Sequence, residues 1–333
     1  MSRIARTGLM LDILRYWRRP TPRPAVLGYD VTYRCNQRCT YCGVPHRDRG
    51  ELDTAGALAH LDRFVKAGLR YCVLGGAEPL VRDDIVELAI FLKRARVAVD
   101  LNTNGALLPR RRGILEVVDG VAISYDGPEA LHDAQRGTGS HAAAMAAIAV
   151  AREAGVPVRL TCTLSTANVG AVDEILAFCR RERLPIRFQP VNPVVADDAA
   201  RFDGTAPDPA AMREALARVL RAKRSGAAPV LNSRAALDYY MQWPDYTRQI
   251  ACAAGRLFCR MDPTGAVYAC TGRQDGLHVP LSEHATVLDA MAAAAPEGCR
   301  ACWCGGNLEM NLLIEGGPLG ALREAPSLLR WSR

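Results

Sequence analysis

The chain has 333 residues, a formal net charge of +7 and 49% hydrophobic residues. This composition is typical of globular proteins, and no run of about 18 apolar residues predicts a membrane span. Residues 1–29 hold six arginines against Asp12 alone, so most of the excess charge lies there and the remainder is nearly neutral. Composition therefore gives no support to a nucleic-acid groove, and no nucleic-acid partner is expected.

The chain contains twelve cysteines. Its start lacks the cleavage site of a secretory signal, so we expect a cytoplasmic protein whose thiols stay reduced. Clustered cysteines in that compartment usually bind metal. Three others, Cys72, Cys162 and Cys179, lie in strand or helix patterns and are expected in the core.

Residues 1–24 are predicted to form a basic amphipathic arm. Between residues 3 and 19, apolar residues recur at helical spacing among five arginines. Such a helix is typical of a segment that lies weakly on an anionic membrane surface or shelters an apolar substrate. The simpler alternative is a helix that packs against the rest of the protein and closes one end of it.

From residue 25 the sequence alternates short β-branched runs with helical patterns. Strands are predicted at 25–32, 70–75, 97–103, 120–125, 157–163 and 185–190, and helices at 54–68, 83–95, 109–118, 141–155, 168–183 and 209–224. The alternation predicts an α/β fold, a partial (β/α)6 barrel over residues 25–208. Connecting helices over 209–250 then lead to a small cysteine-rich C-terminal domain over 251–333. In such folds the reactive groups gather where the strands end.

The loop after the first predicted strand carries Cys35, Cys39 and Cys42. Thiolates suit iron-sulfur sites, and three of them can hold a cubane cluster while leaving its fourth iron open. The alternatives are a structural zinc site, which normally has four ligands, and unrelated buried cysteines.

This CxxxCxxC spacing, with Tyr41 just before the last cysteine, resembles the signature of the radical S-adenosylmethionine (radical SAM) superfamily. The resemblance extends from residue 25 to about residue 190 through several ordered motifs. It implies that the cysteines hold a 4Fe-4S cluster whose open iron chelates S-adenosylmethionine. One electron from the cluster then gives a 5'-deoxyadenosyl radical, and an electron donor such as flavodoxin or ferredoxin is implied as a partner.

The loops after the later strands are similar to the family's cosubstrate-binding motifs. Gly75, Gly76 and Glu78 belong to a Gly-Gly-Ala-Glu-Pro sequence, in which glycines permit close backbone approach and a carboxylate pairs with the methionyl ammonium group. The resemblance also implies cosubstrate contacts from Tyr41, Asn102, Asn104, Ser124, Asp126, Arg136 and Thr163. Ordinary turns, a surface salt bridge at Arg136 and a plain strand face at Thr163 are the alternatives.

A second group of cysteines lies between residues 252 and 304. Pro-Thr-Gly at 263–265 predicts a hairpin that brings Cys252 and Cys270 together, while Cys299 and Cys302 form a CxxC pair. Two such pairs are enough for a four-thiolate site, which is either a zinc ribbon or an iron-sulfur cluster.

This region resembles the SPASM and twitch extensions of the superfamily, because Cys252, Gly265 and Cys270 fit their opening motif. No cysteine follows Cys304, so one auxiliary 4Fe-4S cluster is expected rather than two. The expected ligands are Cys252, Cys270, Cys299 and Cys302, with Cys259 or Cys304 as replacements. A spare thiol can also donate hydrogen to a substrate radical, and Cys259 followed by Cys304 are the candidates for this catalytic role.

The expected reaction is the oxidation or epimerisation of a small-molecule or carbohydrate substrate in a biosynthetic pathway. Peptide maturation is the second alternative, because no peptide-recognition module precedes the predicted barrel. Lipid modification, which rests on the basic arm, is the third. A non-enzymatic iron-sulfur or zinc scaffold would explain the cysteines but not the motif at 75–79 and the later loops.

Overall fold

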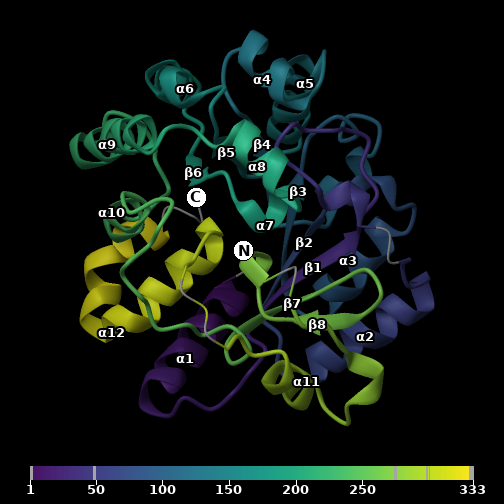
Figure 1. The fold of residues 1–333 in the computed structure, drawn as a ribbon. Coiled ribbons are helices and arrows are strands. Elements are labelled where there is room, and N and C mark those ends of the chain that lie inside the picture. The colour runs from purple at the N-terminus through teal and green to yellow at the C-terminus, as the bar shows by residue number, and fades with distance from the viewer. Residues whose placement is uncertain (1–2, 48–49, 274–275, 298, 300, 330–333) are drawn as a thin grey trace.

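The computed structural model describes residues 3–47, 50–273, 276–297, 299 and 301–329 (Figure 1). Within these residues, nine strands form one open sheet in the order β6-β5-β4-β3-β2-β1-β7-β8-β9. The strands are β1 Val26–Thr32, β2 Tyr71–Gly76, β3 Ala98–Thr103, β4 Gly120–Ser124, β5 Val158–Leu164, β6 Ile186–Pro190, β7 Phe258–Met261, β8 Ala266–Tyr268 and β9 Val279–Pro280. Strands β1 to β7 pair in parallel, and β8 and β9 extend the sheet in antiparallel pairing.

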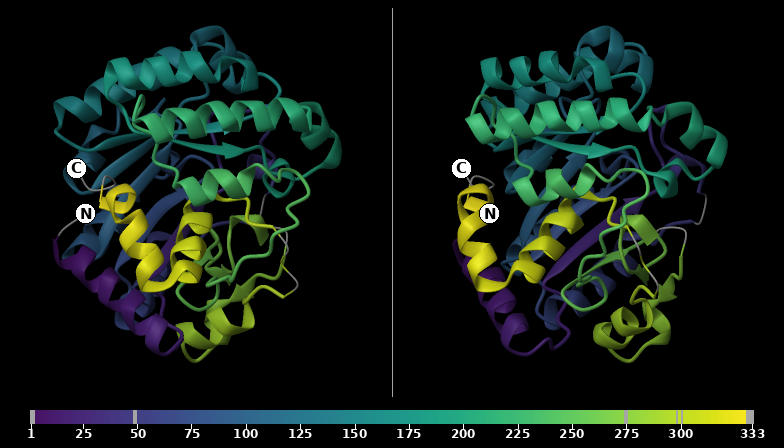
Figure 2. Two further views of the ribbon diagram at one scale, coloured as in Figure 1. Left: turned by 90° about the vertical axis from the view of Figure 1, so that its left-hand side faces the viewer. Right: turned by 60° about the vertical axis from the view of Figure 1, so that its left-hand side comes forward.

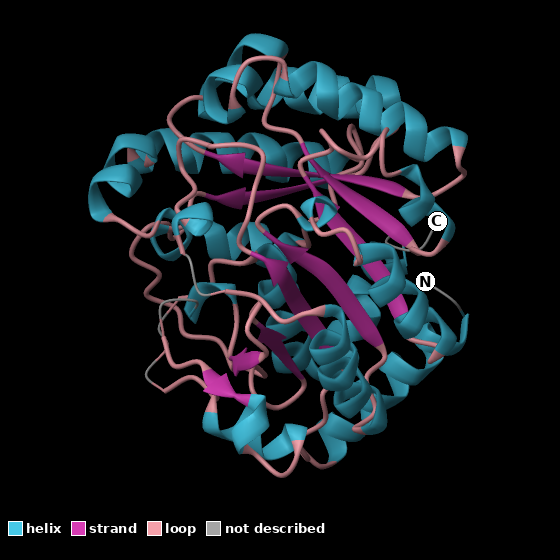
Figure 3. Cartoon of the chain, turned by 90° about the vertical axis from the view of Figure 1, so that its right-hand side faces the viewer, coloured by secondary structure: helices cyan, strands magenta, loops and turns pink. Residues whose placement is uncertain are grey.

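Helices surround this sheet, as Figure 3 shows. They are α1 Arg3–Arg18, α2 Thr54–Lys66, α3 Ile85–Arg94, α4 Glu129–Arg136, α5 Ser140–Glu153, α6 Val172–Glu182, α7 Pro193–Ala196, α8 Ala199–Thr205, α9 Pro209–Ser225, α10 Arg234–Tyr240, α11 Val287–Ala293 and α12 Gly305–Leu329. Helix α12 is kinked at Gly317, where φ is +60°. None of the helices in the described part of the chain is long and apolar enough to cross a membrane.

The partial barrel is confirmed, and each of the six predicted barrel strands is present within one residue of its expected bounds. The helix predicted over 109–118 is wrong: only a short 3-10 turn, Arg112–Glu116, forms there. Gly113 in its middle is a poor helix former, and the β-branched Val117 and Val118 follow at once. Helix α4 is not predicted from the sequence, which identifies only a motif that includes Arg136 in this segment.

The two faces of the sheet differ sharply in polarity, because alternate residues along a strand point to opposite sides. One face consists of apolar residues such as Tyr29, Leu74 and Leu101, which join one hydrophobic core with residues of α2, α3, α5 and α6. The registers place the charged or polar residues Asp30, Asp100, Asn102, Arg159, Arg187 and Arg260 on the other face. This polar face is the inner side of the open barrel.

The C-terminal region is built onto the same sheet. Strand β7 pairs with β1, with Arg260 opposite Gly28, and a β carbon on Gly28 would lie 2.4 Å from the Arg260 guanidinium group. The predicted hairpin is confirmed: β7 and β8 are antiparallel, and Gly265 in their turn has φ of +86°. Helix α12 lies between α10 and α1 (Figure 2), so the cysteine-rich segment before it sits beside the barrel rather than apart from it.

Candidate functional site

The loop after β1 carries Cys35, Cys39 and Cys42, all partly exposed. The thiols are close enough to raise one another's pKa electrostatically. Burial, the larger cause, raises the pKa of Cys42 to about 11. Two donors point at sulfur atoms: Arg136 Nη1 lies 3.8 Å from Cys39 Sγ, and Asn104 Nδ2 lies 3.8 Å from Cys35 Sγ. Three thiols on one loop, with cationic and amide donors beside them, fit an anionic iron-sulfur cluster.

Asp126, at the end of β4, ties this loop to the barrel. Its side chain is fully buried and accepts hydrogen bonds from Arg136 Nε at 2.6 Å, Tyr41 Oη at 3.1 Å and the Thr163 backbone N–H at 2.9 Å. Arg136 also donates to Tyr41 Oη and lies over the Tyr41 ring. In this structure Asp126, Arg136 and Tyr41 therefore contact one another and hold the cysteine loop in place.

Glu78, after β2, is fully buried and accepts three hydrogen bonds. Oε1 accepts from the Leu80 N–H at 3.1 Å and from Thr103 Oγ1 at 2.8 Å, and Oε2 accepts from the Asn104 N–H at 2.8 Å. Desolvation outweighs these bonds and raises the pKa of Glu78 to about 7. The hydrogen bond from the Asn104 backbone to Glu78 links the loops after β2 and β3. The side-chain amide of Asn104 in turn contacts Cys35 in the cysteine loop.

Gly76 is required by close backbone packing. Its φ is +104°, and a β carbon would come within 2.5 Å of the Thr32 carbonyl oxygen. The next residues bond the same segment, since the Ala77 and Glu78 N–H groups donate to the Thr32 and Arg34 carbonyl oxygens. The glycine thus lets the loop after β2 lie directly against the start of the cysteine loop.

The remaining predicted cosubstrate residues lie on the polar face of the sheet, at or near the carboxyl ends of the strands. Asn102 is exposed there and Ser124 is partly exposed, whereas Thr163 is 7% exposed. Gly75 is opposite Asp30 in the register, and Ser124 opposite Thr161. The structure thus brings the predicted cosubstrate residues towards the end of the sheet that the cysteine loop follows.

The second site gathers the C-terminal cysteines. Cys252, Cys270, Cys299, Cys302 and Cys304 are all partly exposed. Desolvation raises the pKa of Cys270 to about 12, with smaller contributions from the thiols of Cys252, Cys304 and Cys299. Among the described residues, no three His, Cys, Asp or Glu side chains gather tightly enough for a single metal ion. A cubane cluster does not need such a gathering, because its ligands bind separate iron atoms.

Asn311, from the second turn of α12, bridges two of these cysteines. Its Nδ2 lies 3.7 Å from Cys252 Sγ and 3.7 Å from Cys302 Sγ, while Oδ1 accepts from the Ala253 N–H at 3.0 Å. The side chain is 2% exposed. One buried amide therefore joins cysteine segments some fifty residues apart in the sequence. The sequence analysis missed it, since nothing local distinguishes this asparagine.

A frame of tyrosines supports the same segment. Tyr239 Oη accepts a hydrogen bond from the Cys302 N–H at 2.9 Å, and Tyr240 Oη donates to the Trp303 carbonyl oxygen at 3.2 Å. Tyr246 stacks on Tyr239 and meets Trp303 edge to face. These aromatic groups from α10 and the loop after it fix where Cys302 and Cys304 lie.

The two spare thiols have different surroundings. Cys259 is 1% exposed and belongs to the apolar core, because it lies on the helix-facing side of β7. Its thiol therefore points away from the polar face, and Cys259 is no longer the first candidate for the hydrogen donor. Cys304 is partly exposed and interacts electrostatically with Arg187 and Arg260 of the polar face.

Gln135 is another residue that the sequence analysis missed. It is 2% exposed, its carbonyl oxygen accepts from the Thr40 N–H of the cysteine loop, and its Oε1 accepts from Ser165 Oγ at 2.6 Å. Its Nε2 has no hydrogen-bond partner within the described part of the chain. A buried donor left over beside the cysteine loop fits a site that receives a polar ligand.

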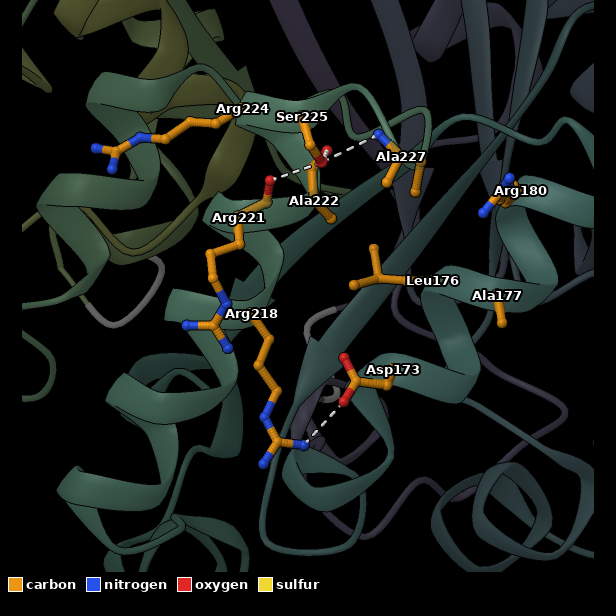
Figure 4. Close-up of a pocket in the computed structure, with 11 residues that line it drawn as sticks. Asp173, Leu176, Ala177, Arg180, Arg218, Arg221, Ala222, Arg224, Ser225 and Ala227 are labelled. Carbon is orange, nitrogen blue, oxygen red and sulfur yellow. Dashed lines mark hydrogen bonds and ion pairs between the residues drawn. The ribbon is translucent and has the colours of Figure 1, made fainter.

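The structure also contains a cavity of about 630 Å³ away from these loops, between α6 and α9 (Figure 4). It is lined by apolar residues such as Leu176 and Ala222 and by arginines such as Arg180 and Arg221. None of the predicted site residues lines this cavity. Its position on the outer layer of helices separates it from the cysteine sites.

Comparison with known proteins agrees with this geometry. Residues 29–179 match the Radical SAM superfamily. The chain is 32% identical to the mycofactocin maturase MftC of Mycobacterium ulcerans, over 74% of this chain and 68% of the relative. It is 31% identical to the pre-heme d1 synthase of Dinoroseobacter shibae over 68% and 59%, and 31% identical to the PqqA peptide cyclase of Gluconobacter oxydans over 48% and 47%.

Solved structures show the same fold at low sequence identity. A structure of anSMEcpe with bound AdoMet is 16% identical, covers 81% of this chain and 80% of its own, and gives a TM-score of 0.64. Streptococcus suis SuiB bound to its precursor peptide SuiA is 15% identical, covers 96% and 76%, and also gives 0.64. This chain is therefore an enzyme of the radical SAM superfamily with a SPASM/twitch-like C-terminal region, and its cofactors are S-adenosylmethionine and 4Fe-4S clusters.

Proposed function

We propose that this radical SAM enzyme modifies a peptide. The observation that carries the proposal is the similarity to a mycofactocin maturase over 74% of the chain, together with that to a PqqA peptide cyclase. The peptide-bound SuiB structure supports it, because the same fold accommodates a peptide there. Peptide modification, expected second from the sequence, thus moves ahead of the small-molecule or carbohydrate substrate.

In this proposal Cys35, Cys39 and Cys42 hold the 4Fe-4S cluster that binds the cosubstrate. When bound, the cluster would supply the one electron that cleaves S-adenosylmethionine into methionine and the 5'-deoxyadenosyl radical. The chain's own part is positioning: Glu78 pairs with the methionyl ammonium group, and the backbone of Gly75 and Gly76 approaches it closely. Asn102, Asn104, Ser124 and Thr163 supply polar contacts at the same end of the sheet.

The polar face of the barrel is suited to holding a peptide. Its charges are fixed in pairs: Arg159 Nη1 lies 2.5 Å from Asp100 Oδ2, and Arg260 and Tyr268 both donate to Asp30. Paired charges hold their geometry and still accept further hydrogen bonds, which suits backbone amides and carbonyl groups. Cys304 lies near this face and replaces Cys259 as the proposed thiol for hydrogen donation.

The expected ligands of the auxiliary cluster remain Cys252, Cys270, Cys299 and Cys302, and we propose that Asn311 supports it. Asn311→Leu in a chain whose Cys35, Cys39 and Cys42 are alanine should lower the auxiliary cluster's reduction potential, because N–H···S contacts stabilise the more negative reduced state. It should also hasten iron loss to a chelator about tenfold, as loss of outer-shell support does. Potentiometry and chelation kinetics measure both effects.

The matched control is Asn232→Leu. Asn232 is equally buried, but among the described residues its amide bonds only the backbone of Phe188 in β6. Its loss should lower stability and leave the cluster's potential unchanged. If Asn311→Leu and Asn232→Leu shift the potential alike, Asn311 has no particular role at the cluster.

Cosubstrate affinity should depend on pH through Glu78. Its pKa of about 7 means that the carboxylate form, which pairs with the ammonium group, increases as the pH rises through neutrality. The affinity for S-adenosylmethionine should therefore rise about tenfold between pH 6 and pH 8. Anaerobic equilibrium dialysis measures this dependence. In Glu78→Gln, which keeps an acceptor for Leu80 and Thr103, binding should be weaker and nearly independent of pH; an unchanged profile would assign the titration elsewhere.

A tetrapyrrole substrate is the second candidate, favoured by the pre-heme d1 synthase relative. Anaerobic incubation of the reconstituted enzyme with S-adenosylmethionine, a reductant and either candidate peptides or tetrapyrroles separates the two. The proposal expects one mole of modified peptide, detected by its change in mass, for each mole of 5'-deoxyadenosine formed. Turnover of a tetrapyrrole with every tested peptide unchanged would favour the second candidate instead. We also propose that flavodoxin or ferredoxin donates the electron to the cluster. The proposed compartment is the cytoplasm, where cysteine thiols stay reduced.

A further inference from the structure

Helix α1 turns three large apolar side chains towards water. Met10, Leu11 and Leu14 are 44%, 46% and 44% exposed. Within the part of the chain whose side chains are described, only Leu277 and Leu288 are also exposed large apolar residues. Spacings of three and four residues place Met10 and Leu11 one turn from Leu14. The three side chains thus form one apolar patch on one face.

The opposite face anchors the helix firmly. Ile13 and Tyr16 are buried in a hydrophobic cluster with Phe258 and Leu313, and Trp17 Nε1 donates to the Ile314 carbonyl oxygen at 3.0 Å. This packing agrees with the simpler expectation for the arm, a helix that closes one end of the protein. It leaves the outward patch unexplained, because the core contacts use only the other face.

Basic residues lie beside the patch, towards the end of the helix. Arg15 keeps 68% of its side chain exposed although it contacts Asp12. Arg18 and Arg19 are exposed and form no ion pair with any described residue. Long arginine side chains beside apolar ones can reach phosphate groups while the apolar groups enter the lipid interface. This pairing favours an anionic lipid surface over an uncharged apolar partner.

The position of α1 leaves the reactive loops free. Asp12 pairs with Arg23 and Arg70, which precede β1 and β2, so α1 lies at the amino-terminal ends of the strands. The cysteine loop follows the opposite end of β1. Figure 2 shows α1 and α12 side by side at the edge of the molecule. A surface bound there would not cover the cosubstrate site.

We propose that α1 docks this enzyme on an anionic membrane surface, with Met10, Leu11 and Leu14 in the interface and Arg15, Arg18 and Arg19 facing the lipid phosphates. Three apolar side chains and three arginines make a reversible, salt-sensitive attachment. The proposal holds for any substrate, because the docking face and the reactive loops lie at opposite ends of the barrel.

Vesicle flotation of the reconstituted full chain tests it. The probes are phosphatidylcholine vesicles with and without 30% phosphatidylglycerol. We expect binding only to the anionic vesicles, weakening as salt rises from about 50 mM to about 500 mM. The Met10→Gln, Leu11→Gln, Leu14→Gln triple variant, which keeps good helix formers, should bind at least about tenfold more weakly.

The matched control is Leu277→Gln, which removes a 65% exposed leucine elsewhere and should bind as the unaltered chain does. Circular dichroism should show all variants folded. Failure of the unaltered chain to bind anionic vesicles, or equal binding by the triple variant, overturns the proposal. A monomer-dimer change in the triple variant without vesicle binding would also overturn it, since the patch would then contact a second copy.

Discussion

Replacing Cys35, Cys39 and Cys42 together with alanine should abolish 5'-deoxyadenosine formation completely while leaving about four irons per chain. The three thiols lie in one loop and are the proposed holders of the cluster whose open iron binds the cosubstrate. The C-terminal cysteines lie on other segments and keep their support from Asn311 and Tyr239. Iron analysis and product chromatography measure the two results separately.

Two controls sharpen this prediction. Changing the buried core residues Cys72 and Cys179 to alanine should leave both the iron content and the product unchanged, apart from a loss of stability. A triple variant without any iron would mean that the C-terminal cysteines bind no cluster of their own. A triple variant that still makes 5'-deoxyadenosine would disprove the assignment of the first loop.

Asp126→Ala should cost about 3–5 kcal/mol of unfolding free energy. Arg136 is 8% exposed, and without Asp126 its charge would be buried with no carboxylate beside it. The Thr163 N–H would lose its acceptor as well. Urea unfolding followed by circular dichroism measures the change.

Asp173→Ala is the matched control. Asp173 pairs with Arg218 at 3.1 Å but is 70% exposed, so its loss should cost less than about 1 kcal/mol. Removing both partners in Asp126→Leu with Arg136→Met should recover much of the lost stability, because no charge stays buried. Equal costs for Asp126→Ala and Asp173→Ala would show that the buried pair does not hold the cysteine loop.

Local patterns in the sequence are enough to predict the barrel, and they indicate which residues follow its strands. Strands β1 to β6 are short runs separated by helical periods, and motif residues follow where those strands end. Parallel strands bring their ends to one edge, so Glu78, Asn104 and Asp126 were expected to lie close together. The structure gives their contacts, which no spacing shows: Glu78 binds the Asn104 N–H, and Asp126 binds Arg136.

Contacts between distant segments could not be predicted. Nothing near β7 indicates that it pairs with β1, and so nothing indicates that Cys259 faces the core. A cysteine in a four-residue strand can face either side, and only its pairing partner decides which. Asn311 was missed for the same reason, because its role depends on two cysteines brought to it by folding.

The sequence ranks peptide modification second because that ranking rests on a module rather than on groups that contact substrate. The polar-face residues that we propose to meet a peptide, such as Asp30, Arg187 and Arg260, are scattered over three strands and form no local motif. Only the registers bring them to one face. Similarity to a maturase and a peptide cyclase then favours a peptide there.

Deuterium transfer tests the central claim most directly. The reduced, reconstituted enzyme is incubated with S-adenosylmethionine and either deuterated candidate peptides or deuterated carbohydrates, and 5'-deoxyadenosine is analysed by mass spectrometry. We predict deuterium in 5'-deoxyadenosine from a peptide, and no product from the variant that lacks Cys35, Cys39 and Cys42. Label that comes from a carbohydrate and from none of the peptides would contradict the proposed function.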